Sequence, residues 1–425
     1  SLAVSHLSTG NVTFIDYGVP ETYKTLIAGT GANLSQSLAI SPDGTRIYLP
    51  QTRSNSTNLA LLFDTTVFPI VNVVDMLNLE FVSQERITID SADQPVNMPF
   101  AVALSPDGEN LYIVNAGSDD VSVIDLESNR GVGHVAVGAN PRGIATTLDG
   151  ARIFVNNTLD GTLSVIDGTN HKIIGEIILT RIPTSPILLS GKKIFNSAAS
   201  PTLSTDNWIS CATCHFDGLM DSRTWLGFPD GPRNTPSLRG IANTLPLHWS
   251  GDLDELQDVE ITIQEIQKGE GLIGGKAFDS LGAPHSGISG DLDALAAYMA
   301  SLRLLPSPNK GNIDTFTHGE FLFNTLDCKS CHTPPMYTDK LLHDVDTGDS
   351  LLEKNSHGRG TRFDTPSLHG LWLTAPYFHD GSANTLQEVL STGIVHDISD
   401  RSDKAEIASL IEYLIMLPRP QSVSP

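Results

Sequence analysis

The chain has 425 residues, 40% of them hydrophobic, and a formal net charge of −23. This length exceeds one ordinary domain, so two or three domains are expected. The excess of acidic residues argues against nucleic acid as a partner, because phosphate binding relies on Lys and Arg; we interpret the charge as a solvated acidic surface.

A repeated strand pattern fills residues 1–188. Its unit is an apolar strand, an Asp-Gly turn and an alternating strand: AISPDGTRIYLP (39–50), ALSPDGENLYIVN (103–115) and ATTLDGARIFVNN (145–157). A second strand ending in Asp follows each unit, as in VNVVD (71–75), VSVID (121–125) and LSVID (163–167), and VTFID (12–16) is a copy without its front half. The Asp-Gly pair supplies the positive φ that a tight hairpin needs. About four short strands per unit, with 42 residues between the last two copies, predict the blades of a β-propeller.

These units resemble the YVTN family of β-propeller repeats, and about three and a half blades are recognisable. A closed propeller usually has more blades. The alternatives are therefore a fragment, an open array, or a homodimer in which two chains close one ring. No catalytic constellation stands out, so we expect a scaffold or a docking surface.

The pattern changes around residues 181–192, and we place a boundary near 188. Beyond it, DLDALAAYMASLRLL (291–305) and DKAEIASLIEYLIML (403–417) have the i, i+3, i+4 apolar spacing of helices. The predicted fold is multidomain, with an all-β partial propeller followed by a mainly α module of two cytochrome c-like units. The predicted domains are 1–188, 189–310 and 311–418, with a tail at 419–425.

Nothing in the sequence predicts a membrane span. No apolar run approaches the roughly 18 residues of a membrane-spanning helix. The first residues, SLAVSHLSTG, lack a basic and then apolar leader, so a signal peptide either does not exist or was removed before this numbering begins.

The second half of the chain is duplicated. CATCH (211–215) and CKSCH (328–332) contain all four cysteines, and a TPSL segment follows each of them. In the first copy Pro236 and Gly251 are 15 residues apart, and in the second the corresponding Pro and Gly have the same spacing. The sequence therefore predicts two related modules, each with one CxxCH motif.

CxxCH is the pattern that attaches c-type haem. The two thiols bind the haem vinyl groups, and the adjacent histidine becomes an axial ligand of the iron. A zinc site would need a further pair of ligands for each motif, and a redox dithiol would not need the histidine. The sequence thus predicts two covalent haems, held by Cys211, Cys214 and His215 and by Cys328, Cys331 and His332.

The order CATCH, RNTPSLRGIAN, LHWSGD, CKSCH and DTPSLHGLWLTAPYFHDGSANTLQEV resembles the di-haem cytochrome c peroxidase/MauG superfamily across residues 190–418. The resemblance implies an oxidoreductase that uses hydrogen peroxide and is exported to the periplasm or the cell surface. It also implies a small cytochrome or cupredoxin as the electron donor, or a partner protein as the substrate. The repeats in front resemble a longer subgroup that joins YVTN repeats to the di-haem module.

For the first haem, typical members of the family place a second histidine before the RNxP segment. Residues 216–233 contain no histidine here. We therefore expect an open iron on the far side of His215, with Met220 and His248 as alternative ligands.

Peroxide cleavage at an open iron needs an acid/base group on the distal side. The resemblance implies a carboxylate downstream of Trp249, and Glu260 and Glu265 are the candidates. Trp249 itself resembles the family's tryptophan between the haems, an electron relay, and His379 resembles a second position near the haem interface.

For the second haem, the resemblance implies a further axial ligand after the PYFHDG segment. His396 is the strong ligand in that region, so we expect a low-spin His332/His396 haem. Met416 is the alternative, although it also fits the apolar face of the last helix.

The resemblance also implies a calcium ion at Asn234, Thr374 and Pro376. An amide oxygen and two backbone carbonyls suit this hard cation. Arg239 and Arg362 are expected to pair with haem propionates, and His369 occupies the place equivalent to Arg239.

Three functions follow from these observations. The leading one is a peroxide-using di-haem enzyme, which is either a peroxidase or a MauG-like oxidant of a residue on a partner protein. The alternatives are a non-catalytic electron-transfer protein with two six-coordinate irons, and a binding protein that acts through its propeller.

Overall fold

The computed structural model describes residues 2–16, 18–19, 23–29, 31–353 and 358–417, apart from the side chain of residue 394. The predicted tail at 419–425 lies outside these residues. The chain divides into two compact units. We call residues 1–55, 61–214 and 262–277 the sheet unit, and residues 56–60, 215–261 and 278–425 the C-terminal unit. The division falls inside the CATCH motif, between Cys214 and His215, and the predicted domain limits near 188 and 310 stay predictions.

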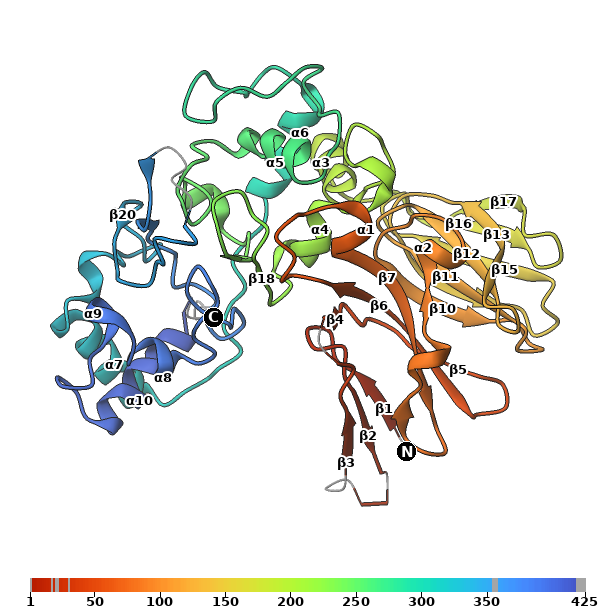
Figure 1. The fold of residues 1–425 in the computed structure, drawn as a ribbon, viewed down its shortest axis with the longest axis horizontal. Coiled ribbons are helices and arrows are strands. Elements are labelled where there is room, and N and C mark those ends of the chain that lie inside the picture. The colour runs from red at the N-terminus through yellow and green to blue at the C-terminus, as the bar shows by residue number, and fades with distance from the viewer. Residues whose placement is uncertain (1, 17, 20–22, 30, 354–357, 418–425) are drawn as a thin grey trace. The chain divides into compact units, whose positions relative to one another are not determined.

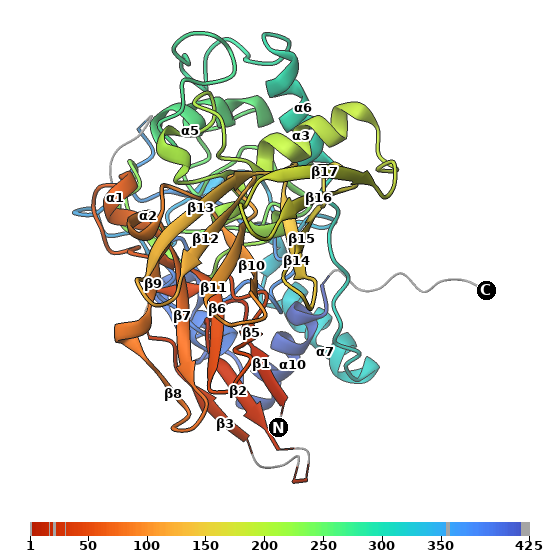
Figure 2. The same cartoon turned by 90° about the vertical axis from the view of Figure 1, so that its right-hand side faces the viewer.

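Four antiparallel sheets follow one another along the chain in the sheet unit (Figures 1 and 2). The first has the order β1-β2-β3, with β1 (Leu2–Ser5), β2 (Val12–Ile15) and β3 (Tyr23–Leu26). The second has the order β4-β6-β7-β8 with β5 on β6 and β9 on β7, and its strands are β4 (Ala32–Asn33), β5 (Ala39–Ile40), β6 (Arg46–Ser54), β7 (Val67–Asp75), β8 (Glu80–Phe81) and β9 (Ile87–Thr88). The third runs β10 (Pro99–Leu104), β11 (Asn110–Asn115), β12 (Asp120–Asp125), β13 (Arg130–Ala136), and the fourth runs β14 (Pro141–Thr146), β15 (Arg152–Asn157), β16 (Thr162–Asp167), β17 (Ile173–Ile178).

Each sheet shares a hydrophobic cluster with the next one. Val12 and Phe14 of the first sheet pack with Ile47 of the second. Val71 of the second sheet packs with Ile113 of the third, and the third and fourth sheets share a further cluster of the same kind. The strands of the middle sheets are buried on both faces, and this explains why they are rich in Val and Ile. The serial order matches the repeat in the sequence, and its assignment to a propeller stays a prediction.

The Asp-Gly turns have the predicted conformation. Gly44, Gly108 and Gly150 have φ values of 73°, 79° and 69°. In each turn a Ser or Thr hydroxyl donates a hydrogen bond to the turn aspartate, as Ser41 does to Asp43 at 2.6 Å. The three turns are therefore copies in structure as well as in sequence.

Short helices complete the sheet unit. α3 begins after Ser185, whose hydroxyl accepts the backbone N–H of Leu188, and Pro186 occupies its first position as is typical of helix starts. The helical segments are α1 (Phe63–Thr66), η1 (Ser83–Glu85), α2 (Ile89–Ala92), α3 (Pro186–Asn196), η2 (Thr205–Asn207) and α4 (Cys211–Cys214). α5 (Val259–Glu265) begins in the C-terminal unit and ends in the sheet unit.

The C-terminal unit is made of helices joined by long loops. Its core lies between α7 and α10 and contains Phe323, Leu410 and Tyr413. Met416 is 3% exposed in the same core, which agrees with its place on the apolar face of the last helix. The elements are η3 (Phe216–Gly218), β18 (Thr224–Trp225), β19 (Arg233–Asn234), η4 (Ile241–Asn243), η5 (Leu256–Asp258), α6 (Gly290–Ala300), α7 (Ile313–Thr325), η6 (Cys328–Ser330), β20 (Leu342–His343), β21 (Phe363–Asp364), α8 (Leu386–Val389), α9 (Gly393–His396) and α10 (Lys404–Ile415).

Both predicted helices are present: α10 lies within the predicted segment 403–417, and α6 ends five residues early. The helix predicted at 291–305 ends at Ala300. The Ser301 hydroxyl bonds the Tyr298 carbonyl, and the Leu302 carbonyl accepts the N–H of Gly240 outside the helix. A contact with a distant loop thus stops a helix whose apolar spacing continues.

Candidate haem-binding sites

The first pair of cysteines lies on α4 in the sheet unit, and Asn97 fixes the start of this helix. The Asn97 side-chain amide donates to the Trp208 carbonyl at 2.9 Å and to the Thr213 hydroxyl at 3.2 Å. The Ser210 hydroxyl donates to its oxygen at 3.2 Å. Asn97 comes from the segment before β10 and is 1% exposed. The sheets therefore hold the cysteines of the CATCH motif in place.

Gln267 contacts the thiol itself. Its Nε2 lies 3.4 Å from Cys211 Sγ, and its carbonyl accepts the indole N–H of Trp208 at 3.0 Å. Burial raises the pKa of Cys211, so this thiol is protonated at neutral pH. Sequence reasoning missed both Asn97 and Gln267, because neither belongs to a motif.

We expect Asn97→Ala to lower the free energy of unfolding by about 3 kcal/mol, because it removes the side-chain partner of the buried Trp208 carbonyl and one of the partners of each of the Ser210 and Thr213 hydroxyls. The yield of haem at the CATCH motif should fall with it. Thermal unfolding and the haem content per chain measure the two effects. Asn170→Ala, at an exposed turn of the same unit, should change neither. Equal stability and haem content in both variants would contradict this role.

His215, in the C-terminal unit, is already oriented for an iron. Its Nδ1–H donates to the Pro236 carbonyl at 3.0 Å and, more weakly, to the Leu219 carbonyl at 3.4 Å. Burial lowers the pKa of His215 to about 4, so the imidazole is neutral near pH 7. A carbonyl at Nδ1 fixes the tautomer in which Nε2 carries the lone pair, as in metal-ligating histidines.

His332 repeats this arrangement. Its Nδ1–H donates to the Tyr337 carbonyl at 3.1 Å, and the Pro366 carbonyl also interacts with the ring. Burial lowers the pKa of His332 to about 4 as well. Pro236 and Pro366 are the prolines of the two TPSL segments, so the repeated TPSL brings a carbonyl back to each haem histidine. The recurrence of TPSL was the signal for this role.

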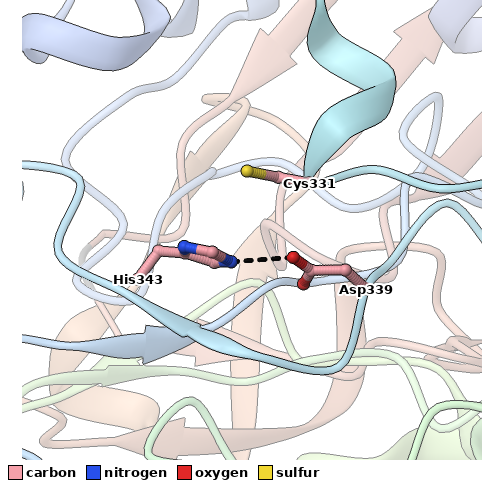
Figure 3. Close-up of side chains that lie close together, drawn as sticks. All are labelled: Cys331, Asp339 and His343. Atoms are coloured by element: carbon pink, nitrogen blue, oxygen red, sulfur yellow. Dashed lines mark hydrogen bonds and ion pairs between the residues drawn. The ribbon is translucent and has the colours of Figure 1, made fainter.

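A cluster of three side chains includes one cysteine of the second motif (Figure 3). Cys331, Asp339 and His343 each place one potential ligand atom within 4.8 Å of the others, and the Asp339 carboxylate bonds His343 Nε2 at 2.8 Å. Thiolate, carboxylate and imidazole also suit zinc. None of the four cysteines, all of them described, is in a disulfide. The Cys331 thiol belongs to CKSCH, so haem attachment accounts for it.

His396 lies near His332 in the C-terminal unit. The charge of His396 is among the influences that lower the pKa of His332. Its ring centroid is 5.6 Å from that of Phe378, and burial lowers the pKa of His396 too. A half-buried, neutral imidazole in this position agrees with the predicted His332/His396 pair, which stays a prediction.

His248 has a carboxylate partner, whereas Met220 does not. His248 Nδ1 lies 2.9 Å from Asp252 Oδ1, while the Met220 sulfur accepts a bond from the Ser222 hydroxyl at 3.7 Å. Although burial opposes it, this ion pair raises the pKa of His248 and lowers the pKa of Asp252 to about 2. The charge of His248 also contributes to the low pKa of His215.

The two candidate carboxylates on α5 differ in burial. Glu260 is 0% exposed, whereas Glu265 is exposed. Five residues along a helix separate side chains by about 140° around its axis, so one faces the interior and the other faces solvent. The burial favours Glu260 as an acid/base group, and Glu265 fits a solvated helix face.

Comparison with known proteins shows what this chain is similar to. A family model described as RoxA-like, cytochrome c-like, matches residues 363–394. The methylamine utilization protein MauG of Methylorubrum extorquens is 27% identical over 246 residues, 47% of this chain and 66% of that protein. Hydrazine synthase subunit gamma of Kuenenia stuttgartiensis is 25% identical over 280 residues, 54% of this chain and 77% of that one. Cytochrome c551 peroxidase of Nitrosomonas europaea is 25% identical over 262 residues, 53% and 77% of the two chains.

These similarities support the di-haem cytochrome c peroxidase/MauG superfamily as the family of this chain. The relatives imply covalently bound haem c, and the neutral imidazoles of His215 and His332, beside cysteines that form no disulfide, fit that group. The relatives are oxidoreductases, but they are matched over 66% to 77% of their own length and differ in name and reaction. Within the described ranges, no helix combines the length and the apolar content needed to cross a membrane.

The two modules meet about a pseudo-twofold axis. Trp249 and His379, equivalent by the duplication, contact each other with ring centroids 6.4 Å apart. Their carbonyls are used reciprocally: Asn234 N–H donates to the His379 carbonyl at 2.5 Å, and Asp364 N–H donates to the Trp249 carbonyl at 2.8 Å. Reciprocal bonds between equivalent positions are the mark of a two-fold interface. The equivalence of Trp249 and His379 in the sequence thus corresponds to equivalent positions on the two sides of this interface.

A buried ion pair supports this interface. Glu353 accepts a bond from Arg233 at 2.7 Å through one oxygen and contacts His379 Nε2 at 2.9 Å through the other. The side chains of Arg233 and Glu353 are 9% and 1% exposed. The His379 ring stacks on Phe363 at 3.8 Å. Although burial opposes it, these bonds lower the pKa of Glu353. Sequence reasoning missed Arg233 and Glu353.

We expect Glu353→Gln to destabilise the protein by about 3 kcal/mol, because it leaves the buried Arg233 charge without its counter-ion. Urea unfolding of the holoprotein measures this. Glu320→Gln, an exposed change on α7, should stay within about 0.5 kcal/mol of the parent protein. Equal unfolding midpoints for the two variants would rule out the ion pair as a support.

The His248–Asp252 pair predicts a pH dependence of stability. The pKa of Asp252 is depressed to about 2 in the folded protein, so its contribution is complete above its unfolded pKa near 4 and is lost as pH falls toward 2. Asp252→Asn should therefore cost up to about 2 kcal/mol at pH 6 and about half of that at pH 3. Asp254→Asn, on the same loop and exposed, serves as control. A cost that does not change between the two pH values would show that the loss is not electrostatic.

The predicted calcium residues lie together in part. The Asn234 amide nitrogen contacts the Pro376 carbonyl at 2.5 Å and the Phe378 carbonyl at 3.2 Å, and its Oδ1 is a buried oxygen without a partner among the described residues. An unsatisfied amide oxygen beside backbone carbonyls fits a hard cation. Thr374 lines a cavity two residues before Pro376. Calcium stays a proposal.

The predicted propionate partners make backbone contacts. Arg239 donates to the Asp217 carbonyl at 2.7 Å and Arg362 to the Gly358 carbonyl at 3.0 Å. Arg239 and His369, equivalent by the duplication, line the same cavity as Thr374. Arg362 is exposed. The structure therefore brings Arg239 and His369 to one cavity, whereas Arg362 does not line that cavity.

Proposed function

We propose that the protein is an exported di-haem c-type oxidoreductase that uses hydrogen peroxide at the haem of His215. The observation that carries this is the difference between the two modules. The second has a neutral imidazole, His396, near its haem histidine, whereas the first has polar acid/base groups, the buried Glu260 and the His248–Asp252 pair. An electron carrier needs two strong ligands on each iron, and a peroxide site needs an open iron with a proton-transfer group.

Each residue has a defined part in this proposal. Haem c supplies peroxide activation and one-electron storage when it is bound. His215 would hold the first iron through Nε2, and His332 with His396 would hold the second. Glu260 moves a proton between the two peroxide oxygens. Trp249, at the two-fold interface, offers an aromatic path for electrons between the modules, and Glu353 fixes the imidazole of His379 beside it.

The partners of this reaction belong to the same proposal. Either a small cytochrome or cupredoxin returns the electrons, or an oxidisable residue of a partner protein supplies them, as in a MauG-like reaction. Calcium held by Asn234, Thr374 and Pro376 would brace the interface. The acidic chain and its sheet unit suit a docking role for such a partner.

Electron paramagnetic resonance of the ferric protein as isolated tests the open site. We expect one high-spin and one low-spin haem, and peroxide should react with the resting protein. Two low-spin haems without direct reaction would contradict the proposal and favour the electron-transfer alternative.

Glu260→Gln and Glu265→Gln form a matched pair on one helix. We expect Glu260→Gln to lower the peroxide turnover number by about 100-fold or more, the usual contribution of a general acid/base, while Glu265→Gln stays at the parent rate because its side chain faces solvent. Steady-state rates with an excess of reductant measure both. A loss confined to Glu265→Gln would reverse the assignment.

A further inference from the structure

The loop that follows each TPSL segment has the same backbone in both modules. His248 and Phe378 have φ values of 63° and 67°, unusual for residues other than glycine. The N–H of the glycine three residues later donates to the carbonyl of each, at 3.1 Å for His248 and 3.3 Å for Phe378. The bridges Leu247↔Leu253 and Tyr377↔Ala383 close both loops. Positions 248 and 378 are therefore structural equivalents.

Position 378 faces the proposed distal ligand of the second haem. The Phe378 ring lies 5.6 Å from the ring of His396. By the duplication, position 248 belongs to the corresponding face of the first haem site. The electrostatic influence of His248 on His215 agrees with this placement, because the two imidazoles must lie within interaction range.

The first module carries a polar pair where the second carries none. His248 takes the place of Phe378, and Asp252 takes the place of Ser382. Asp252 Oδ1 holds His248 Nδ1 at 2.9 Å, and its backbone carbonyl accepts the Ser280 hydroxyl at 2.5 Å. In the described part of the chain no hydrogen bond is recorded at Nε2 of His248. Asp230 and Arg233 are the other charged groups that act on the ring.

We propose that His248 is a catalytic residue of the first haem site: in its neutral form, with Nδ1–H donated to Asp252, it accepts a proton from hydrogen peroxide as the peroxide binds, and Asp252 positions it. The O–H bond of the peroxide breaks, the proton goes to Nε2 of His248, and the hydroperoxide anion is left to bind. His248 thereby takes over the first of the two proton transfers assigned to Glu260 above, and Glu260 keeps the second, the donation of a proton to the leaving oxygen. This inference rests on the proposed peroxide reaction and adds a residue to it.

Cyanide tests the proton-accepting role without any turnover. Hydrogen cyanide must also lose its proton when it binds a ferric haem, so a distal base accelerates its association. The association rate of cyanide is measured by stopped-flow absorbance with the holoprotein and with His248→Phe, Asp252→Asn and Asp254→Asn. Phe is suited to the loop, because Phe378 has the same backbone conformation.

We expect His248→Phe to slow cyanide association by about 100-fold. Asp252→Asn should slow it by about 10-fold, because the ring loses its fixed orientation. Asp254→Asn should match the parent protein, and the high-spin signal of the first haem should persist in all three variants.

Two outcomes would overturn the inference. One is an unchanged cyanide rate in His248→Phe. The other is a first haem that is low-spin in the parent protein and becomes high-spin in His248→Phe, which would make His248 an iron ligand. Failure of the peroxide proposal looks different: the parent protein would not react with peroxide, while the effect of His248→Phe on cyanide would remain.

Discussion

The donation of each haem histidine's Nδ1–H to a backbone carbonyl is the interaction around which both modules are built. This bond fixes the tautomer of the imidazole and leaves Nε2 for the iron. For His215, the accepting carbonyl is that of Pro236, about twenty residues further along the chain, so the chain must return to the ring. The TPSL segment makes that return. The loop behind it then closes on itself through Leu247 and Leu253, which brings His248 and Trp249 to their places. The hydrogen bond from the histidine Nδ1–H to the backbone carbonyl thus determines the position of the loop that carries the other residues of each site.

The duplication has kept the backbone while the side chains have diverged. Equivalent positions still meet across the two-fold interface: the guanidinium of Arg233 lies 5.7 Å from the ring of Phe363, its counterpart, just as Trp249 meets His379. Polar and charged residues have collected in the first module, where the second has Phe363 and Phe378. Such a division suits one module that handles protons and another that handles electrons only.

The sequence predicted the features that local patterns encode. The CxxCH motifs, the duplication, the Asp-Gly turns and the helix of residues 403–417 all depend on residues near one another in the chain. Asn97, Gln267 and Glu353 were missed because each acts through a partner far along the sequence, and nothing beside them repeats. The choice between Glu260 and Glu265 was likewise out of reach, since their spacing tells which faces of α5 they occupy but not which face is buried. The early end of α6 at Ala300 has the same origin, a contact with a distant loop.

The hydrogen bonds between Asn97 and the start of α4 have a consequence for the order of folding. The hydrogen bond between Asn97 and Thr213 joins residues 116 positions apart in the chain, and contacts of such long range form late because the intervening segment must first lose its freedom. The third and fourth sheets lie within that intervening segment. The cysteine pair of CATCH is therefore expected to acquire its final geometry only after these two sheets are assembled, whereas the CKSCH pair depends on α7 and α10. We therefore expect the CKSCH pair to reach its folded geometry, and to become competent for haem attachment, before the CATCH pair.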